Sequence, residues 1–400
     1  MVGTSLRKPA NILKAYLQSL AWQVVPPNVD LRFIFVDDGL DDEAGRVLQE
    51  FFKDHEGGVL TDNSRGPTHD FSDTHPVTHQ WSESAMRRVG QHKDQILAYA
   101  REHRAEAVWL ADADLIMDPM TLTSLWSVPE QIVCGVYWTR WSKNPPEMQP
   151  VHAGPQVWQT HPYGLGGNGM EEWELRRELI NRQLVQVYGQ GACTLIRRGA
   201  LQKGVSFAPW PSNTAPGLMQ GEDRHFCIRA EALHIKMVAD GWPDIFHIYH
   251  RPEDEALIPE MLKKLGDHPA HPLERPLQFG DLVSLELTPL EPILGAGYFP
   301  PQLVRGRLGK LGLHPELEQA VSEMESGTER IVPTHFGLDY PFPPYRGKRR
   351  LIRVRLIDHK PFGFPPVVDQ EVFVNNLGGW LDTTTITPEL DEQVREVHAG

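Results

Sequence analysis

Apolar and polar residues along roughly the first 250 positions follow a pattern typical of a sheet covered by helices. Apolar residues recur at helical spacing over 12–20, which predicts an early helix. Compact apolar runs at 31–36, 107–110 and 132–137 predict buried strands, with further helices between them. Strands that alternate with helices in this way indicate an α/β domain.

Acidic residues directly follow two of these strands. Asp37 and Asp38 come after the first strand, and Asp112 and Asp114 come after the second. In open α/β sheets the ligand binds at the carboxyl ends of the strands, so we expect these side chains to meet at one site. Two carboxylates one residue apart can share a divalent cation, which would bridge to a diphosphate. A solvated turn is the alternative for so short a motif.

Two histidines lie near the end of a later strand, expected over 244–250. His247 and His250 are three residues apart, so strand alternation places them on opposite faces. We expect one of them, preferably His247, to complete with its imidazole a metal site begun by Asp112 or Asp114. A structural role is the alternative for either histidine.

Two further pairs of charged residues are candidates for chemistry. Glu222 and Asp223 open an apolar helix, where they either stabilise its first turn or supply a base that takes a proton from an acceptor hydroxyl. Arg88 and Lys93 belong to the segment before the Asp112 strand. They either lie on a solvated helix or contact phosphate or sugar oxygens.

Composition and charge exclude several classes of protein. The chain has 39 basic and 53 acidic residues and a net charge of −14, which argues against general nucleic-acid binding. Its three cysteines fit neither a zinc site nor a disulfide framework, so we expect buried free thiols. No apolar stretch approaches the roughly 20 residues that span a bilayer, and no secretory pattern is present. We expect a soluble, cytoplasmic protein without a transmembrane segment.

The motifs occur in an order that resembles one family. The order is Phe35-Val-Asp-Asp38, Val108-Trp-Leu-Ala-Asp-Ala-Asp114, Gly189-Gln-Gly-Ala-Cys-Thr-Leu-Ile-Arg-Arg198, Gly221-Glu-Asp-Arg-His-Phe-Cys227 and then a late histidine. Over about residues 2–252 this series resembles GT-A fold glycosyltransferases of the Asp-x-Asp type, more closely the family-2 type. The first strand, near Thr4–Arg7, looks very short for that family.

The resemblance implies a donor and a set of site residues. The donor is a UDP- or GDP-linked sugar, and the cofactor is Mn²⁺ or Mg²⁺. Asp223 would be the catalytic base of an inverting transfer, with Glu222 beside it. The remaining implied contacts are Asp37 and Asp38 to the nucleoside, Asp112 and Asp114 to the metal and diphosphate, and His247 (or His250) as the late metal ligand.

The C-terminal part has a different pattern. Alternation at 281–287 and 350–357 predicts strands, and the run from His314 to Pro333 suggests a helix followed by a strand. This order resembles FKBP-type prolyl isomerases and implies a small α+β domain. Leu317 stands where that family commonly has a tryptophan, and Phe336 stands where a tyrosine is usual. We therefore expect a binding or scaffold domain rather than an isomerase.

The expected organisation is a Rossmann-like GT-A domain at 1–252, a linker at 253–276 with a helix near Leu257 to Lys264, an FKBP-like domain at 277–360 and a tail at 361–400. The expected function is transfer of a sugar, of the hexose type, to a glycan, small-molecule or protein hydroxyl. Two alternatives stay open. A sugar nucleotidyltransferase would need a Gly-rich basic loop, for which Ser5–Pro9 is too short. A peptide-binding folding helper would carry an inactive transferase domain.

Overall fold

The described residues of this computed structural model form two compact units. One unit comprises residues up to 266, and the other comprises residues from 277 onward. The described ranges are 1–62, 83–141, 152–159, 170–210, 221–248, 252–266, 277–292, 299–338 and 343–360. His250 and the expected tail at 361–400 lie outside these ranges.

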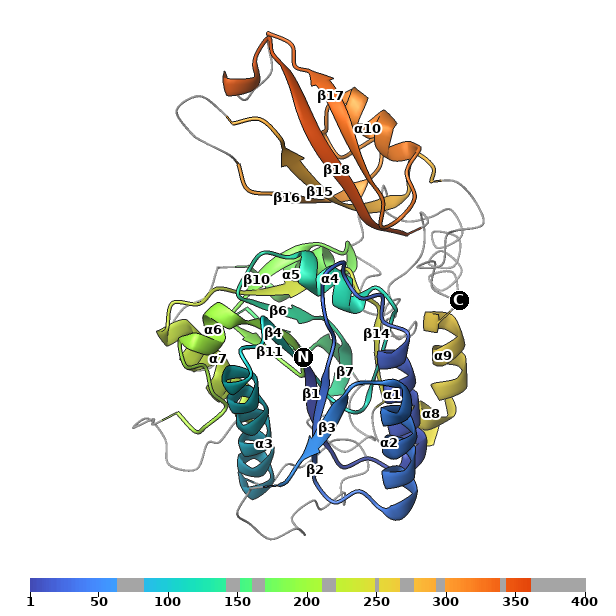
Figure 1. The fold of residues 1–400 in the computed structure, drawn as a ribbon, viewed down its shortest axis with the longest axis vertical. Helices are drawn as coiled ribbons and strands as arrows, with labels where there is room; N and C mark the ends of the chain where they lie inside the picture. The colour runs from blue at the N-terminus through green and yellow to red at the C-terminus, as the bar shows by residue number, and fades with distance from the viewer. Residues whose placement is uncertain are drawn as a thin grey trace. The chain divides into compact units, whose positions relative to one another are not determined.

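An eight-stranded mixed sheet is the framework of the first unit (Figure 1). Its strands are β1 (Val2–Leu6), β2 (Phe33–Asp37), β3 (Gly57–Leu60), β4 (Ala107–Ala111), β6 (Ile132–Gly135), β10 (Leu184–Val187), β12 (Cys193–Arg197) and β13 (Met237–Asp240). The order is β10-β13-β6-β12-β4-β1-β2-β3. Strands β12 and β10 run antiparallel to their neighbours, and the other pairs are parallel. The expected α/β class is confirmed.

Three helices cover the β1–β3 end of this sheet. α1 (Ala10–Ala21) and α2 (Asp42–Asp54) lie on one face, and α3 (Glu83–Glu102) lies on the other (Figure 1). Asp41 caps α2, because its carboxylate accepts hydrogen bonds from two amides of the first turn. Alternate residues of β2 face opposite helices: Phe35 contacts Tyr16 of α1, whereas Val36 belongs to the core that α3 shares. Burial on both faces explains the continuous apolar runs of the sequence.

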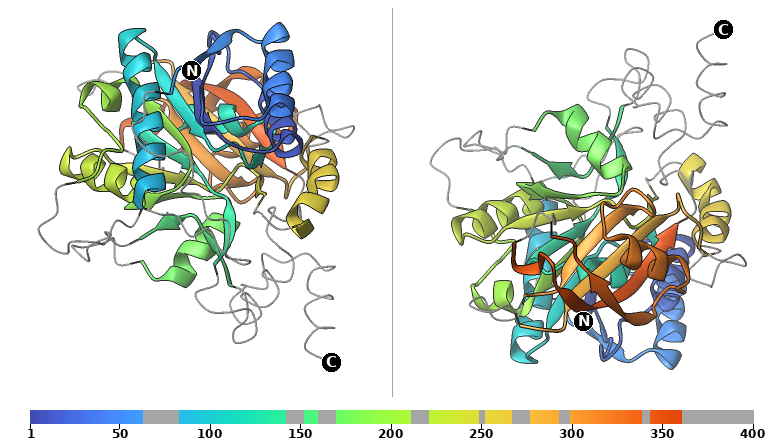
Figure 2. Two further views of the ribbon diagram at one scale, coloured as in Figure 1. Left: turned by 90° about the horizontal axis from the view of Figure 1, so that it is seen from below. Right: turned by 90° about the horizontal axis from the view of Figure 1, so that it is seen from above.

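The remaining elements of the first unit are short. The helices are α4 (Thr121–Ser127), α5 (Glu172–Ile180), α6 (Arg198–Gln202), α7 (Glu222–Ala232), α8 (Pro252–Ala256) and α9 (Ile258–Gly266). Three strand pairs are β5 (Leu115–Met117) with β14 (Ile245–His247), β7 (Trp138–Trp141) with β8 (His152–Pro155), and β9 (Val157–Trp158) with β11 (Gly189–Gln190). α7 packs beside α3, as the views in Figure 2 also show.

The structure differs from the sequence-based expectation at two places. β1 is five residues long and pairs with both β2 and β4, so it is a full central strand rather than a very short one. Only helices were expected between the first two predicted strands, but Gly57–Leu60 forms the edge strand β3. The helix expected near Leu257 to Lys264 is confirmed as α9, which packs in one apolar cluster with Ile12 and Ile116.

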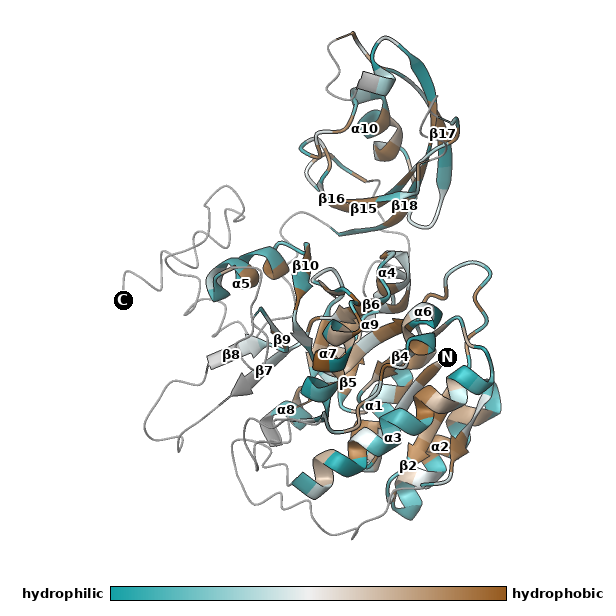
Figure 3. Ribbon diagram, turned by 90° about the vertical axis from the view of Figure 1, so that its left-hand side faces the viewer, coloured by the Kyte–Doolittle hydropathy of each residue, from teal (hydrophilic) through white to brown (hydrophobic). Residues whose placement is uncertain are grey.

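The core of the first unit is apolar and includes two distinct clusters of buried residues. Strands β2 and β4 are predominantly hydrophobic, whereas α2 and α3 carry both kinds of residue (Figure 3). All three cysteines are buried and free, as expected. Among the described helices, none is both long and apolar enough to cross a membrane.

The second unit is a small antiparallel sheet with a helix packed on it. Its elements are β15 (Leu282–Pro289), β16 (Gln302–Arg307), α10 (Pro315–Ser322), β17 (Glu329–His335), the 3₁₀ turn η1 (Pro343–Tyr345) and β18 (Arg349–Lys360). The strand order is β16-β15-β18-β17. Leu317 and Val321 of α10 share a core cluster with Val354 and Leu356. The expected α+β class is confirmed for this unit, and β16 was not expected.

Candidate functional site

The Asp112–Asp114 turn lies at the carboxyl end of β4, in the middle of the large sheet. The Asp112 amide donates to the carbonyl of Ala192, and the Leu115 amide donates to the carbonyl of Asp112. These two bonds close a tight turn, so that β5 begins at once. The side chain of Asp112 is 35% exposed and that of Asp114 is 10% exposed. Asp112 is therefore the more accessible of the two carboxylates.

The ammonium of Lys8 and the imidazole of His247 both lie beside the carboxylate of Asp114. Lys8 Nζ lies 2.7 Å from Asp114 Oδ2, and His247 Nε2 lies 3.6 Å from the same oxygen. The antiparallel pairing of β14 with β5 places His247 opposite Leu115, next to Asp114. Burial alone would raise the pKa of Asp114, but Lys8 and His247 together hold this pKa well below its usual value. Asp114 is therefore ionised at neutral pH.

A second acidic group is centred on Lys93 of α3. Its ammonium Nζ lies 2.9 Å from Glu222 Oε1, 2.8 Å from Asp223 Oδ1 and 4.0 Å from Asp112 Oδ1. Glu222 and Asp223 form the first turn of α7, which follows Gly221 at a φ of 112°. A positive φ favours glycine, so this residue type suits the sharp entry into the helix. Lys93 thus links the start of α7 to the end of β4.

Burial shifts the pKa values of this group. It raises the pKa of Asp112 to about 7, with Lys93 opposing the shift and neighbouring carboxylates adding to it. Burial also raises the pKa of Asp223 to about 6, again against the influence of Lys93. Burial would lower the pKa of Lys93, but Asp112, Asp223 and Glu222 raise it well above its usual value. Lys93 is therefore charged, and the two aspartates titrate near neutral pH.

A separate cluster lies at the carboxyl ends of β1, β2 and β3. Arg88 donates to the carboxylates of both Asp38 and Asp62. His92 Nε2 lies 2.8 Å from Asp62 Oδ1, and its Nδ1 lies 2.8 Å from Ser5 Oγ. The strand ends and α3 thus bring together five polar side chains. Asp38 is 50 residues from Arg88 in the sequence, and Ser5 is 87 residues from His92.

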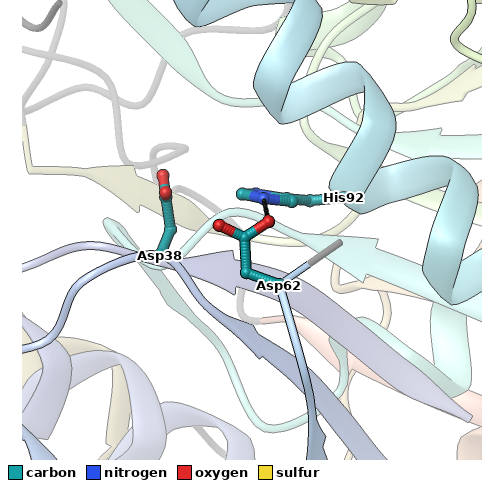
Figure 4. A group of neighbouring side chains, drawn as sticks. All are labelled: Asp38, Asp62 and His92. Carbon is teal, nitrogen blue, oxygen red and sulfur yellow. Dashed lines mark hydrogen bonds and ion pairs between the residues drawn. The ribbon is translucent and has the colours of Figure 1, made fainter. Parts of the chain in front are cut away.

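Within the described part of the chain, Asp38, Asp62 and His92 bring three potential metal-ligand atoms within 4.8 Å of one another (Figure 4). The guanidinium of Arg88 already forms ion pairs with both carboxylates of this group. Both ring nitrogens of His92 also have hydrogen-bond partners. These contacts favour an ion-pair network over a cation site here.

The donor atoms near Asp114 are also of the types that bind a divalent cation, and Lys8 pairs with Asp114 as Arg88 pairs with Asp38 and Asp62. They comprise the carboxylate oxygens of the Asp112–Asp114 turn and the Nε2 of His247, a mixed set that suits Mn²⁺. The other ring nitrogen of His247 lies 3.1 Å from Thr139 Oγ1. Such a contact orients the ring of a metal-ligating histidine and fixes which nitrogen faces the metal.

The structure places the sequence-predicted residues in two neighbourhoods. In the first, Asp114 lies close to His247. Asp112, in the same turn as Asp114, also lies 4.0 Å from Lys93, which contacts Glu222 and Asp223. Asp38 and Arg88 belong to the second cluster. Asp37 is exposed, and its carboxylate accepts from the amides of Gly39 and Leu40. His250, the alternative metal ligand, lies outside the described residues.

Sequence reasoning missed four residues of these clusters, namely Ser5, Lys8, Asp62 and His92. Asp62 could have been found as a third acidic strand end, had β3 been recognised. Lys8 and His92 belong to ordinary helical or turn contexts, and their partners are far away in the sequence. No local signal distinguishes them.

Comparisons with known proteins give only distant likenesses. No family model and no curated protein matches the chain. The mannosyltransferase PcManGT from Pyrobaculum calidifontis, in complex with GDP-Man and Mn²⁺, is 12% identical; the match covers 63% of this chain, with a TM-score of 0.34. S. aureus TarS 1-349, in complex with UDP-GlcNAc, is 14% identical; the match covers 68% of each chain, with a TM-score of 0.35.

The chain spans only 57% of the length of the mannosyltransferase. Likenesses at these TM-scores do not establish a shared function. None of the matches reported above supports the FKBP resemblance of the C-terminal part.

Proposed function

We propose that the chain is a metal-dependent glycosyltransferase, which moves a sugar from a nucleotide-diphosphate sugar to an acceptor hydroxyl with inversion. One observation supports this proposal most directly. Asp112 and the acidic pair Glu222–Asp223 converge on Lys93, although they come from distant parts of the chain. A sugar transferase needs one group of residues that stabilises the leaving diphosphate and, beside it, another that takes a proton from the acceptor hydroxyl.

The leaving-group side would be formed by Asp112, Asp114 and His247. These residues would hold Mn²⁺ or Mg²⁺, which when bound neutralises charge on the departing diphosphate. Asp114 is suited to this role because its pKa lies well below the usual value, so a carboxylate is present at neutral pH. The cluster of Asp38 and Arg88 lies at the adjacent strand ends, where it would contact the nucleoside.

The acceptor side would depend on Asp223. Its carboxylate accepts the proton of the acceptor hydroxyl, whose oxygen forms a bond to the anomeric carbon of the sugar. The bond from that carbon to the diphosphate oxygen breaks, and the nucleoside diphosphate leaves with the electron pair. Lys93 holds Asp223 in one orientation through the 2.8 Å contact. A pKa of about 6 suits a base that works near neutral pH.

The experiment that tests this proposal is isothermal titration calorimetry with UDP and with GDP, each in Mn²⁺ and in EDTA. The wild type, Asp114→Ala and a control variant, Asp54→Ala, are compared. Asp54 is an exposed residue at the end of α2. We expect one nucleotide to bind only with Mn²⁺, and this binding to disappear in Asp114→Ala but not in the control. If neither nucleotide binds to the wild type under either condition, the transferase proposal is wrong.

A further inference from the structure

Lys8 lies in the short segment between β1 and α1, directly before Pro9, the N-cap of α1. Its side chain is 17% exposed, and its ammonium lies 2.7 Å from Asp114 Oδ2. The two residues are 106 positions apart in the sequence. The contact therefore results from the tertiary fold, which aligns the ends of β1 and β4 as sheet neighbours.

The formal charge around this contact is unbalanced. Four carboxylates, those of Asp112, Asp114, Glu222 and Asp223, share two ammonium groups, those of Lys8 and Lys93. When all four carboxylates are ionised, the formal excess is two negative charges, which one divalent cation would balance. A bound cation would balance the group without any further protein side chain.

The two lysines differ in their relation to such a cation. Lys93 is only 2% exposed, and its closest contacts are to the acidic pair of α7. Lys8 instead holds the oxygen of Asp114 that also faces Nε2 of His247. This oxygen is the one of Asp114 that lies beside the imidazole, so a cation that binds there between Asp114 and His247 competes with the ammonium of Lys8 for it.

We propose that Lys8 is a stand-in cation that exchanges with the metal. This inference rests on the proposed function, because it takes Asp114 as a metal ligand. In the metal-free protein Lys8 neutralises Asp114. The arriving cation displaces the ammonium, whose flexible four-carbon stem lets it turn to the diphosphate of a nucleotide bound at the same place.

The exchange has a thermodynamic consequence. Lys8 weakens cation binding when nucleotide is absent, and it strengthens nucleotide binding when the cation is present. The two ligands therefore bind cooperatively, and by linkage each raises the affinity for the other by the same factor. Removal of the ammonium should shift the two affinities in opposite directions.

The test is isothermal titration calorimetry with Mn²⁺ alone, and then with UDP and GDP at saturating Mn²⁺. The variants are Lys8→Met and the matched control Lys14→Met, which removes an exposed lysine of α1. We expect Lys8→Met to bind Mn²⁺ roughly tenfold more tightly than wild type, the size of one charge-assisted hydrogen bond. It should bind nucleotide more weakly, and Lys14→Met should match the wild type in both titrations.

The outcomes separate this inference from the proposed function. Equal Mn²⁺ affinities in the wild type and Lys8→Met would overturn the exchange and leave the metal site in place. No Mn²⁺ binding in any of the three proteins would overturn both. Poor folding cannot imitate the expected result, because a misfolded variant does not gain affinity for a cation.

Discussion

Replacement of Lys93 by methionine tests whether the acidic pair of α7 depends on one buried counter-charge. Lys93 is 2% exposed, and its ammonium contacts Glu222 and Asp223 at 2.9 and 2.8 Å. Methionine keeps most of the stem and removes the charge. Loss of one partner of a buried ion pair costs about 3–5 kcal/mol, so we expect the free energy of unfolding to fall by about 3 kcal/mol at pH 8.

The loss should be smaller at pH 5, because protons can replace the missing charge. The folded-state pKa of Asp223, at about 6, lies above its unfolded value of about 3.9. A group with this sign stabilises the fold fully below the unfolded pKa and loses that contribution as the pH rises through the folded pKa. Lys93 lowers the pKa of Asp223, so removal of Lys93 raises this pKa further. The pH range in which protonated Asp223 stabilises the folded state then becomes wider.

Urea denaturation followed by tryptophan fluorescence, at pH 5 and pH 8, measures both effects. The control is Lys236→Met, since Lys236 is 51% exposed and its ion pair with Glu130 spans 3.2 Å. An exposed pair contributes up to about 1 kcal/mol. If Lys93→Met loses no more stability than this control at pH 8, the reasoning about a buried counter-charge is refuted.

Three further predictions follow, two from the candidate site and one from a buried ion pair elsewhere in the first unit. Burial raises the pKa of Asp112 to about 7, so protons compete with the cation and Mn²⁺ should bind more tightly at pH 8 than at pH 6; calorimetry that finds equal affinities would contradict this. Asp223→Asn should slow sugar transfer from UDP- or GDP-sugars roughly 10²- to 10⁴-fold without weakening nucleotide binding, whereas weakened binding would place Asp223 at the donor. Arg182→Met removes the guanidinium 3.1 Å from the buried carboxylate of Asp244 and should lower the free energy of unfolding by about 3–5 kcal/mol; a loss below about 1 kcal/mol in urea denaturation would show that this pair is not a buried ion pair of ordinary strength.

The parts of the fold that the sequence predicts are those with strong local patterns. β2 and β4 are continuous apolar runs that end in acidic residues, and their burial on both faces produces that pattern. The same logic led to the Asp112–Asp114 turn. β3 was missed because it contains Gly57 and Gly58 and is only partly buried at the sheet edge. Without β3 there was no reason to single out Asp62.

The remaining misses have a tertiary cause. The ammonium of Lys8 contacts a carboxylate oxygen of Asp114, which is 106 residues away in the sequence, and no local sequence pattern predicts that contact. The helix near Leu257 to Lys264, by contrast, was predicted within the expected linker, and α9 confirms it, because Ile258, Met261 and Leu265 recur at helical spacing and are buried.

The central position of β1 also has a consequence for how the protein folds. β1 precedes β2 and β4 in the sequence and lies between them in the sheet, so Val2 pairs with Trp109 as well as Phe33. During synthesis the side of β1 that receives β4 has no partner until about residue 111 has left the ribosome. Such long-range parallel pairing is slow and leaves strand edges open in the meantime. We therefore expect yields of this protein to depend on growth temperature and chaperone supply more than its final stability would suggest.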